Sequence, residues 1–308
     1  MAVRLALVGM GKIAHDQHLP AIAGNPAFEL VATVSRSGSG VAGVPNASTL
    51  DELLAGDIAV DAVALCTPPQ VRYELAATAL RRGLHVFLEK PPGATLSEVA
   101  LLDALAAEHG VSLFASWHSR FAPGVAAAKA WLAEREVRSA GIVWREDVRH
   151  WHPGQEWIWQ PGGLGVFDPG INALSILTEI MPRAVRLSQA VLEVPENRAT
   201  PIAADLTLID EGGARVSVDF DWRQTGPQSW DIFVETDDGR VQLALGGAAL
   251  TLPGQSPVQE PEREYPGLYA RFAELIADGR SEADVRPLRI VADAFLTGEM
   301  RRVEAFVE

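Results

Sequence analysis

Short apolar runs alternate with amphipathic stretches throughout the first 120 residues, and this alternation limits the possible folds more than any other feature of the chain. The apolar runs often contain β-branched residues and are predicted to form buried strands at 4–8, 30–34, 62–65, 85–88 and 113–116. The stretches between them carry apolar residues at helical spacing, which predicts helices at 13–24, 50–55, 71–82 and 96–109. Strands that alternate with helices pair in parallel. Residues 1–120 therefore predict an α/β Rossmann domain, a doubly wound parallel sheet with helices on both faces.

The pattern changes after residue 120, where polar and apolar side chains alternate along several segments. The alternation is strict in Arg215-Val-Ser-Val-Asp-Phe-Asp221, which is typical of a strand with one covered and one uncovered face. Strands are predicted at 141–146, 185–192, 202–209, 215–221, 229–235 and 240–245, and helices at 122–134, 269–278 and 287–302. Residues 121–308 thus predict an α+β domain with a large, mainly antiparallel open sheet. Its last helix is the element expected to pack back on the Rossmann domain.

Composition argues against several classes of partner. The chain has 308 residues, with 26 Lys and Arg against 40 Asp and Glu, a formal net charge of −14. This excess of negative charge argues against binding nucleic acid or an anionic membrane, since both need a basic surface. The one cysteine, Cys66, allows neither an intramolecular disulfide nor a cysteine cluster for zinc. The apolar run near Met1 is too short for a signal peptide, and no run approaches the ~18 apolar residues of a membrane span, so we expect a cytoplasmic protein.

A glycine-rich turn follows the first predicted strand. Gly9-Met-Gly11-Lys-Ile-Ala14 fits the pattern G-x-G-x-x-[G/A], in which the first glycine turns the chain and the second lets the backbone approach a pyrophosphate. The small Ala14 lets the following helix pack closely on the strand. The match alone is weak, but a strand before it and a helix after it predict a dinucleotide site formed by Gly9, Gly11, Lys12 and Ile13.

The end of the second predicted strand indicates which dinucleotide is bound. NAD-specific sites usually place Asp or Glu there to hold the ribose 2′-hydroxyl, whereas this chain has Val34-Ser35-Arg36-Ser37. The Ser35 hydroxyl and the Arg36 guanidinium suit a 2′-phosphate. The prediction is NADP, with NAD as an accepted substitute. In the alternative interpretation, Arg36 is an ordinary solvated loop arginine.

Two further strand ends carry candidate residues, because ligands of open α/β sheets bind outside the carboxyl ends of the strands. Thr67 and Pro68 follow the third predicted strand, and Glu89 and Lys90 follow the fourth, directly before two prolines. A lysine at this edge is placed to transfer a proton beside a nicotinamide. The alternative is a surface ion pair between Glu89 and Lys90 that precedes a rigid turn.

Several of these motifs recur, in the same order and spacing, in one known family of enzymes. The shared motifs are 9–14, Thr67-Pro68, 83–85, Glu89-Lys90-Pro91, Arg120-Phe121-x-Pro123 and the glycine-rich segment 162–172. Over its whole length the chain resembles the Gfo/Idh/MocA family, whose namesakes are glucose–fructose oxidoreductase and inositol dehydrogenase. The resemblance implies an N-terminal Rossmann domain, a C-terminal open sheet that often forms a dimer interface, and hydride transfer between NAD(P) and sugars or cyclitols.

Four segments resemble a narrower group of enzymes within this family, namely 11–20, 151–154, 157–159 and 167–175. They are similar to segments of bacterial L-arabinose and D-galactose 1-dehydrogenases, which oxidise the anomeric carbon of the pyranose to a lactone. The resemblance implies an NADP-dependent aldose 1-dehydrogenase for L-arabinose, D-galactose or D-fucose, and a homo-oligomer, by analogy a dimer. It also implies that Lys90 and Asp168 remove the C1 hydroxyl proton as hydride leaves C1.

Two positions depart from the family pattern. The common motif places a histidine four residues after the aspartate that corresponds to Asp168, and here that position is Asn172. Asparagine cannot take a proton at neutral pH but can hydrogen-bond a sugar hydroxyl, so acid–base chemistry falls to Asp168, Lys90 or both. The alternative role for Asp168 is to cap the helix that follows it. At the second position Arg72 replaces a histidine, and the sequence offers no account of that change.

Tryptophans concentrated near the middle of the chain are candidates for binding a sugar. A pyranose has a C–H-rich face that packs well on an indole, and Trp151 is the candidate for this contact. Trp230, outside the concentrated group, is a second candidate implied mostly by the resemblance to the family. Core packing is the commoner role of tryptophan, and it is the role expected for Trp144.

Polar residues of the same region are candidates for hydrogen bonds to sugar hydroxyls. They are Glu146, His152 and Asn172, together with His118 after the fifth predicted strand. A metal site is not expected, because His150-x-His152 lacks a third ligand at a convincing spacing.

Two other functions are consistent with these motifs. One is a dehydrogenase that acts on a ring hydroxyl of another sugar or of a cyclitol, and the missing histidine at Asn172 speaks modestly against it. The other is a non-catalytic NADP-binding sensor, since some family members act as dinucleotide-binding transcriptional regulators. Lys90 and Asp168 argue against a sensor, which needs no acid–base pair.

Overall fold

The computed structural model describes residues 1–307, which divide into two compact units. Unit 1 combines Met1–His118 with Glu264–Val285, and unit 2 combines Ser119–Arg263 with the chain from Arg286 onward. The chain therefore passes between the two units three times. The first crossing, after His118, lies beside the boundary predicted near residue 120.

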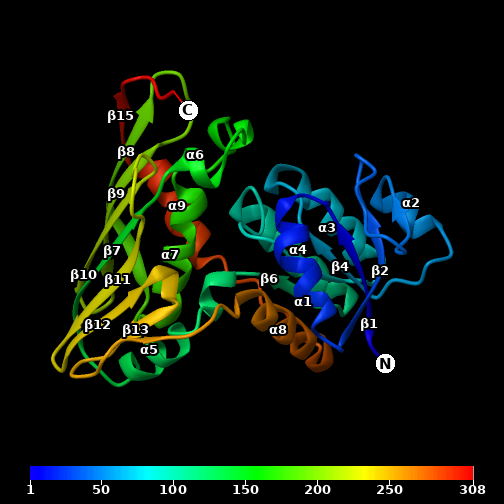
Figure 1. The fold of residues 1–308 in the computed structure, drawn as a ribbon, viewed down its shortest axis with the longest axis horizontal. Helices are drawn as coiled ribbons and strands as arrows, with labels where there is room; N and C mark the ends of the chain where they lie inside the picture. Colours follow the sequence, from blue (N-terminus) through cyan, green and yellow to red (C-terminus); the bar gives the residue numbers. More distant parts are fainter. Residues whose placement is uncertain (308) are drawn as a thin grey trace. The chain divides into compact units, whose positions relative to one another are not determined.

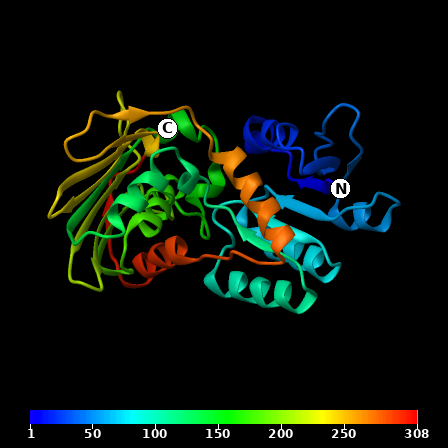
Figure 2. The same ribbon diagram turned by 90° about the horizontal axis from the view of Figure 1, so that it is seen from below.

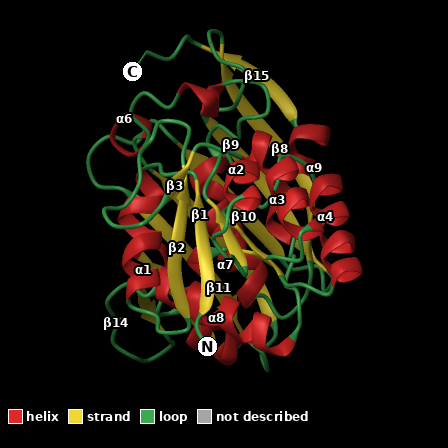
Figure 3. Cartoon of the chain, turned by 90° about the vertical axis from the view of Figure 1, so that its right-hand side faces the viewer, coloured by secondary structure: helices red, strands yellow, loops and turns green. Residues whose placement is uncertain are grey.

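Unit 1 is built on a six-stranded parallel sheet with the order β3-β2-β1-β4-β5-β6, part of which is seen in Figure 3. Its strands are β1 (Val3–Val8), β2 (Phe28–Val34), β3 (Asn46–Ala47), β4 (Ala62–Leu65), β5 (His85–Leu88) and β6 (Leu113–Ala115). All five predicted strands are present, and the Rossmann-type prediction is confirmed. The two-residue β3 is too short to carry an apolar pattern, so the sequence did not indicate it.

Helices cover both faces of this sheet, since successive side chains of a strand point to opposite sides. The helices are the π-helix η1 (Ala14–His18), α1 (Leu19–Ala23), α2 (Leu50–Ala55), the 3₁₀ turn η2 (Pro69–Val71), α3 (Arg72–Arg81), α4 (Leu96–His109) and α8 (Glu264–Asp278). Along β5, Val86 and Leu88 pack in the core that includes residues of α3 and α4. Phe87 points to the opposite face, where its ring contacts Phe272 of α8.

The predicted helix at 13–24 is present, but its first half is a π-helix. The Leu19 N–H bonds to the Ala14 carbonyl, five residues back, instead of four as in an α-helix. Pro20, the next residue, has no N–H to donate and takes a place in the first turn of α1. His18 at the end of the π-helix is fully buried, whereas His15 is exposed.

Helix α8 belongs to unit 1, although the predicted second domain ran from 121 to 308 without interruption. Its buried face includes Phe272, which stacks on Phe28 and Phe114 with ring centroids 5.8 and 6.1 Å apart. The last helix, α9 (Arg286–Thr297), belongs to unit 2. Amphipathicity predicted both helices, but only the tertiary contacts show which sheet each one covers.

Unit 2 contains a nine-stranded sheet with the order β14-β13-β12-β11-β7-β10-β9-β8-β15. Its strands are β7 (Val137–Arg145), β8 (Val185–Pro195), β9 (Ala203–Asp210), β10 (Arg215–Asp221), β11 (Ser229–Thr236), β12 (Gly239–Ala244), β13 (Ala249–Thr251), β14 (Val258–Gln259) and β15 (Glu299–Val303). Two pairs, β7 with β10 and β8 with β15, are parallel, and the others are antiparallel. The prediction of a mainly antiparallel open sheet is confirmed.

The predicted helix at 287–302 is too long. It ends at Thr297, and Glu299–Val303 forms the edge strand β15 beside β8. Gly298 separates the two elements, and a Cβ there would lie 2.4 Å from the Ala294 carbonyl oxygen and 3.1 Å from the Ala190 side chain. Glycine is favoured where a helix ends in such close contact, and pairing with β8 then satisfies the backbone groups that follow.

Helices α7 (Phe167–Ile180) and α9 lie on one face of this sheet, as seen from two directions in Figures 1 and 2. The other helices of unit 2 are η3 (His118–Phe121), whose first residue still belongs to unit 1, α5 (Val125–Leu132), α6 (Val148–Trp151), η4 (Glu156–Trp159) and η5 (Leu245–Gly247). Helix α7 comes very close to the sheet at Gly170, where a Cβ would lie 2.7 Å from the Phe220 ring. None of the helices within residues 1–307 has both the length and the apolar character needed to cross a bilayer.

Candidate functional site

The residues predicted to bind a dinucleotide lie along one edge of the unit 1 sheet. They are Gly9, Gly11, Lys12 and Ile13 after β1, Ser35 and Arg36 after β2, Thr67 and Pro68 after β4, and Glu89 and Lys90 after β5. His118, which is predicted to contact the sugar, follows β6. The edge is common to all of them because parallel strands end on the same side of a sheet.

The turn after β1 has the backbone geometry that its glycines predict. Gly9 has φ +93°, and a Cβ there would lie 3.1 Å from the Thr67 side chain and from the Cys66 backbone. Around Gly11, by contrast, an added Cβ would meet nothing within 4 Å. Ala14 is fully buried, as close helix–strand packing requires. A sharp turn with open space at its second glycine suits the pyrophosphate of a dinucleotide.

A row of hydroxyl groups follows β2. The Ser35 Oγ lies 2.9 Å from the Ser37 Oγ, which lies 3.0 Å from the Ser39 Oγ. Arg36 in the same loop is exposed, and no ion pair joins it to a carboxylate within the described part of the chain. Hydroxyls and a guanidinium that no carboxylate occupies are the groups expected around a phosphate.

Arg72 holds together the loops after β4 and β5. Its guanidinium is buried and donates hydrogen bonds to three backbone carbonyls, those of Thr67, Glu89 and Pro91. Burial lowers the pKa of Arg72 to about 10, which leaves it charged at neutral pH. The tertiary structure thus supplies the role for Arg72 that the sequence did not indicate.

The Glu89 carboxylate is buried beneath the strand end that carries Lys90. Its Oε1 accepts hydrogen bonds from the Tyr265 hydroxyl at 2.7 Å and from the His18 Nε2 at 2.9 Å, and its Oε2 accepts the Lys90 N–H at 2.8 Å. The Tyr269 hydroxyl lies 2.7 Å from the other nitrogen of His18. Glu89 therefore pairs with His18, and the alternative of a surface ion pair with Lys90 is wrong.

The charges of this buried pair support each other. Burial alone raises the pKa of Glu89, but the hydrogen bond and positive charge of His18 lower it to about 2. Burial also lowers the pKa of His18, but its interactions with Cys66, Tyr269 and the hydrogen-bonded Glu89 carboxylate outweigh this effect and leave that pKa well above its usual range.

His118 is part of the same region of unit 1. Its Nδ1 lies 2.5 Å from the Glu264 carboxylate, and its ring stacks on Tyr265 with centroids 5.7 Å apart. Burial lowers the pKa of His118, but the Glu264 carboxylate more than offsets this and leaves the pKa raised.

Unit 2 brings together three of the predicted residues, Glu146, His152 and Asp168. Glu146 follows β7, Asp168 lies in the first turn of α7, and His152 follows α6. The His152 Nε2 lies 3.9 Å from Glu146 Oε1 and 3.7 Å from Asp168 Oδ2. Both carboxylates are buried, with 5% and 4% of Glu146 and Asp168 exposed. The helix-cap alternative for Asp168 is not observed, since Val166 occupies the cap position of α7.

Two indole groups hold the Glu146 carboxylate. Trp222 Nε1 donates to Oε1 at 3.1 Å and Trp230 Nε1 donates to Oε2 at 2.9 Å. Burial raises the pKa of Glu146, these two hydrogen bonds and His152 oppose the rise, and the nearby Asp168 charge adds to it.

The remaining predicted residues of unit 2 lie around this group. Trp151 is 44% exposed, and its ring meets Trp230 edge to face at 5.4 Å. Trp144 is buried, as expected of a core residue. Asn172 is half-buried on α7, one turn after Asp168 and therefore on the same side of the helix.

Sequence reasoning missed several members of these networks, namely Trp222, Glu264, Tyr265 and Tyr269, and it singled out Arg72 without finding its role. Trp222 directly follows the predicted strand 215–221, so its position at a strand end was a usable signal. Tyr265 and Tyr269 stand one turn apart on α8, far along the chain from Glu89, and nothing local indicates their partner. Within residues 1–307, no group of three or more His, Cys, Asp or Glu side chains is arranged to hold a metal ion.

Comparison with known proteins gives consistent matches. Residues 3–116 match the Gfo/Idh/MocA family, described as an oxidoreductase family with an NAD-binding Rossmann fold. The chain is 47% identical to galactose 1-dehydrogenase of Pseudomonas fluorescens over 306 residues, which cover 99% of each chain. The crystal structure of D-galactose-1-dehydrogenase from Rhizobium etli superposes with a TM-score of 0.96 at 60% identity, covering 99% of this chain and 98% of that one. KijD10, a 3-ketoreductase from Actinomadura kijaniata, shares the fold at 20% identity, with a TM-score of 0.86 over 98% of this chain and 100% of its own.

Proposed function

The chain belongs to the Gfo/Idh/MocA family of oxidoreductases, and from that premise we propose that it oxidises the anomeric C1 hydroxyl of an aldopyranose to the lactone, with NADP as the hydride acceptor. The substrates proposed are D-galactose, L-arabinose and D-fucose, which differ only at C5. The observation that carries the proposal is the group of Glu146, His152 and Asp168 beside the exposed Trp151, in a chain that is similar over nearly its whole length to two galactose 1-dehydrogenases.

The sugar is proposed to bind through aromatic side chains that pack on the ring and through polar side chains that hydrogen-bond its hydroxyl groups. The exposed indole of Trp151, supported by Trp230, suits the C–H-rich face of the ring. Glu146, His152 and Asn172 offer acceptors and donors for hydroxyl groups. His118 of unit 1 is a further candidate for such a hydrogen bond.

The edge of the unit 1 sheet fits NADP. Gly9, Gly11, Lys12 and Ile13 would hold the pyrophosphate, Ser35 and Arg36 the 2′-phosphate, and Thr67, Pro68 and the Glu89–Lys90 strand end the nicotinamide half. When bound, NADP supplies the acceptor for the hydride that leaves C1. The cofactor preference rests on the hydroxyl row after β2 and on Arg36, which forms no ion pair with any carboxylate of residues 1–307.

Oxidation at C1 also releases the hydroxyl proton, and this chain must accept it. Lys90 and Asp168 are the proposed acceptors, because Asn172 cannot take a proton at neutral pH. Loss of the hydride from C1 and of the proton from O1 together leaves the C1=O group of the lactone. The cytoplasm is the proposed location, which fits a chain with a single cysteine, because structural disulfides are rare there.

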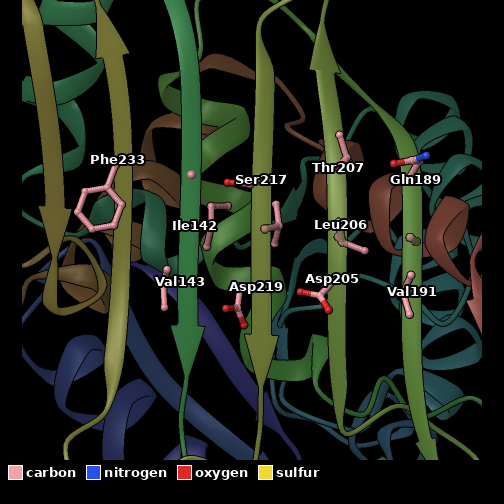
Figure 4. A pocket seen from close by; sticks show the side chains of 13 residues that line it. Ile142, Val143, Gln189, Val191, Asp205, Leu206, Thr207, Ser217, Asp219 and Phe233 are labelled. Atoms are coloured by element: carbon pink, nitrogen blue, oxygen red, sulfur yellow. The ribbon is translucent and has the colours of Figure 1, made fainter. Parts of the chain in front are cut away.

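A homodimer is part of the proposal. Helices α7 and α9 cover one face of the unit 2 sheet, and Figure 4 shows the opposite face, with side chains from β7, β8, β9, β10 and β11. Apolar Val143, Val191 and Phe233 are partly exposed there, while Asp219 is paired with Arg145. A broad face of this mixed character fits a second copy of the chain, as the family resemblance implies.

The experiment that tests the function is reduction of NADP or NAD, followed by absorbance, with a panel of aldoses and inositols. Rapid turnover with D-galactose or L-arabinose and formation of a lactone are the expected results. Turnover with inositols alone would move the reaction to a ring hydroxyl. Tight NADP binding with no turnover across the panel would favour the non-catalytic sensor.

A further inference from the structure

Unit 1 contains a buried polar network to which the proposed proton transfer assigns no role. We call it the Glu89 network, and it consists of His18 from η1, Glu89 from the end of β5, and Tyr265 and Tyr269 from α8. The members come from three segments far apart in the chain, and all four side chains are buried. Burying a carboxylate costs several kcal/mol unless its partners compensate, so this arrangement needs a reason beyond packing.

The reason suggested by the geometry is the backbone of Lys90. The Lys90 N–H donates to Glu89 Oε2 at 2.8 Å, so the carboxylate holds the main chain from which the Lys90 amine extends. The carbonyls on either side, those of Glu89 and Pro91, accept hydrogen bonds from Arg72. The main chain around Lys90 is therefore fixed at the Lys90 N–H by the Glu89 carboxylate and at the carbonyls of Glu89 and Pro91 by Arg72.

The other side of the network reaches the phosphate-binding turn. His18 ends the π-helix that begins at Ala14, the last position of the glycine motif. Its Nε2 contacts Glu89 at 2.9 Å. The network thus joins the segment that receives the cofactor's phosphates to the strand end that carries Lys90.

We propose that His18, Glu89 and Tyr265 are positioning residues, which set the place of the Lys90 amine relative to the phosphate-binding turn. The inference rests on the proposed function, in which Lys90 accepts a proton. It differs from the prediction that Glu89 contacts the cofactor, because both carboxylate oxygens of Glu89 are bonded within unit 1. Loss of a positioning residue lowers kcat, whereas loss of a cofactor contact raises the Kd for NADP.

The first test is kinetic and uses the full-length protein. Glu89→Met removes the acceptor of the Lys90 N–H, and kcat is expected to fall about 50-fold, since small displacements of a reacting group cost up to about 100-fold. The Kd for NADP and the KM for the sugar should stay within about threefold of the wild-type values. Glu89→Gln should recover kcat to within about fivefold, because its amide oxygen can accept the Lys90 N–H while its amide N–H donates to a neutral His18.

A second, milder variant covers the case in which Glu89→Met does not fold. Tyr265→Phe removes one hydrogen bond to Glu89 and should lower kcat about fivefold with an unchanged Kd for NADP. Tyr73→Phe removes a hydroxyl elsewhere in unit 1 and serves as the matched control, with no change expected. Wild-type kcat in both Glu89→Met and Tyr265→Phe would overturn the proposal. So would a Kd for NADP raised tenfold at unchanged kcat, which would make Glu89 a cofactor ligand.

A third measurement does not depend on turnover, so it separates failure of this inference from failure of the proposed function. The chain has three lysines, Lys12, Lys90 and Lys129, and their acylation rates can be followed together by mass spectrometry. Tyr265→Phe and Glu89→Met should raise the rate at Lys90 at least threefold, because the released backbone samples more conformations. Lys12 and Lys129 have side chains 83% and 54% exposed and act as internal references. An unchanged Lys90 rate in both variants would overturn the inference even if the enzyme proves inactive toward every sugar.

Discussion

At the scale of single residues, Arg36 decides the proposed cofactor preference. Arg36→Ala is expected to lower kcat/KM for NADP about 10–100-fold and to leave the value for NAD within about threefold, since charge-assisted hydrogen bonds to a phosphate are worth roughly 1.5–3 kcal/mol. The ratio of the two kcat/KM values is the measurement. Arg81→Ala, which removes an exposed arginine of α3, is the control. An unchanged ratio would mean that Arg36 is only a solvated loop residue.

Lys90 and Asp168 carry the proposed proton transfer. Lys90→Met and Asp168→Asn should each lower kcat by about 10²–10⁴-fold, the usual contribution of general acid–base catalysis, because neither new side chain can accept the proton. NADP binding, measured by fluorescence titration, should be unchanged in both variants. Lys129→Met removes the exposed partner of Glu179 and should keep wild-type activity. Near-normal rates in both test variants would reject this chemistry.

At the scale of elements, Arg72 links the loops that follow β4 and β5. Arg72→Met leaves the buried carbonyls of Thr67, Glu89 and Pro91 without this donor, at about 1 kcal/mol each. The melting temperature is expected to fall by about 6–12 °C. Arg82→Met, an exposed change just after the same helix, should shift it by less than about 2 °C. Equal shifts in the two variants would show that the buried guanidinium does not hold the loops together.

At the scale of the whole molecule, the pair of Glu89 and His18 makes stability depend on pH. The pKa of Glu89 is lowered to about 2, so its contribution is present above its ordinary value of 4.5 and is lost as the pH falls toward 2. The pKa of His18 is raised, so its contribution is complete below 6.5 and is lost as the pH rises through the folded value. Both contributions therefore coincide between pH 4.5 and 6.5.

Urea unfolding of the wild type and of Glu89→Gln tests this dependence. The difference in unfolding free energy between the two proteins should be greatest near pH 5.5, at about 2–4 kcal/mol, and should shrink on acidification to pH 3. It should also shrink in alkaline solution as His18 loses its proton. A difference that is constant from pH 3 to pH 9 would contradict the assignment of charges in the pair.

A further prediction for the whole molecule concerns the face of the unit 2 sheet opposite α7 and α9, where a second copy of the chain is proposed to bind. Val191→Arg places a long charged side chain on a partly exposed position of β8, so it should leave the fold intact and prevent two copies from pairing there. Sedimentation equilibrium should give the mass of one chain for this variant and of two chains for the wild type. Leu296→Arg, at a position of α9 that is 82% exposed, should remain a dimer. A wild-type monomer, or a Val191→Arg dimer, would place any association elsewhere.

The sequence by itself determined those features whose signals are local. Short apolar runs mark buried strands, and periods of two and of 3.6 residues record which side of an element is buried. For this reason 62–65 and 85–88, as apolar runs, and 215–221, by its alternation, match their strands, and 50–55 matches α2. Gly9 records a left-handed backbone conformation in a crowded turn, which favours glycine, and Gly11 lies beside open space in the same motif. Glu146, His152 and Asp168 were each selected from local sequence and from resemblance to the family.

Only the tertiary structure decided which distant groups meet. The pairing of Glu89 with His18 and Tyr265 depends on three segments that close on one another across 71 and 176 positions of the chain. Helix α8 joins unit 1 because its aromatic face fits Phe28 and Phe114, and residues after Gly298 form β15 because β8 offers a free edge. The lowered pKa of Glu89, the buried guanidinium of Arg72 and the edge strand β15 all depend on contacts with residues that are distant in the sequence. Local composition carries no record of those partners, and so they became visible only in the folded chain.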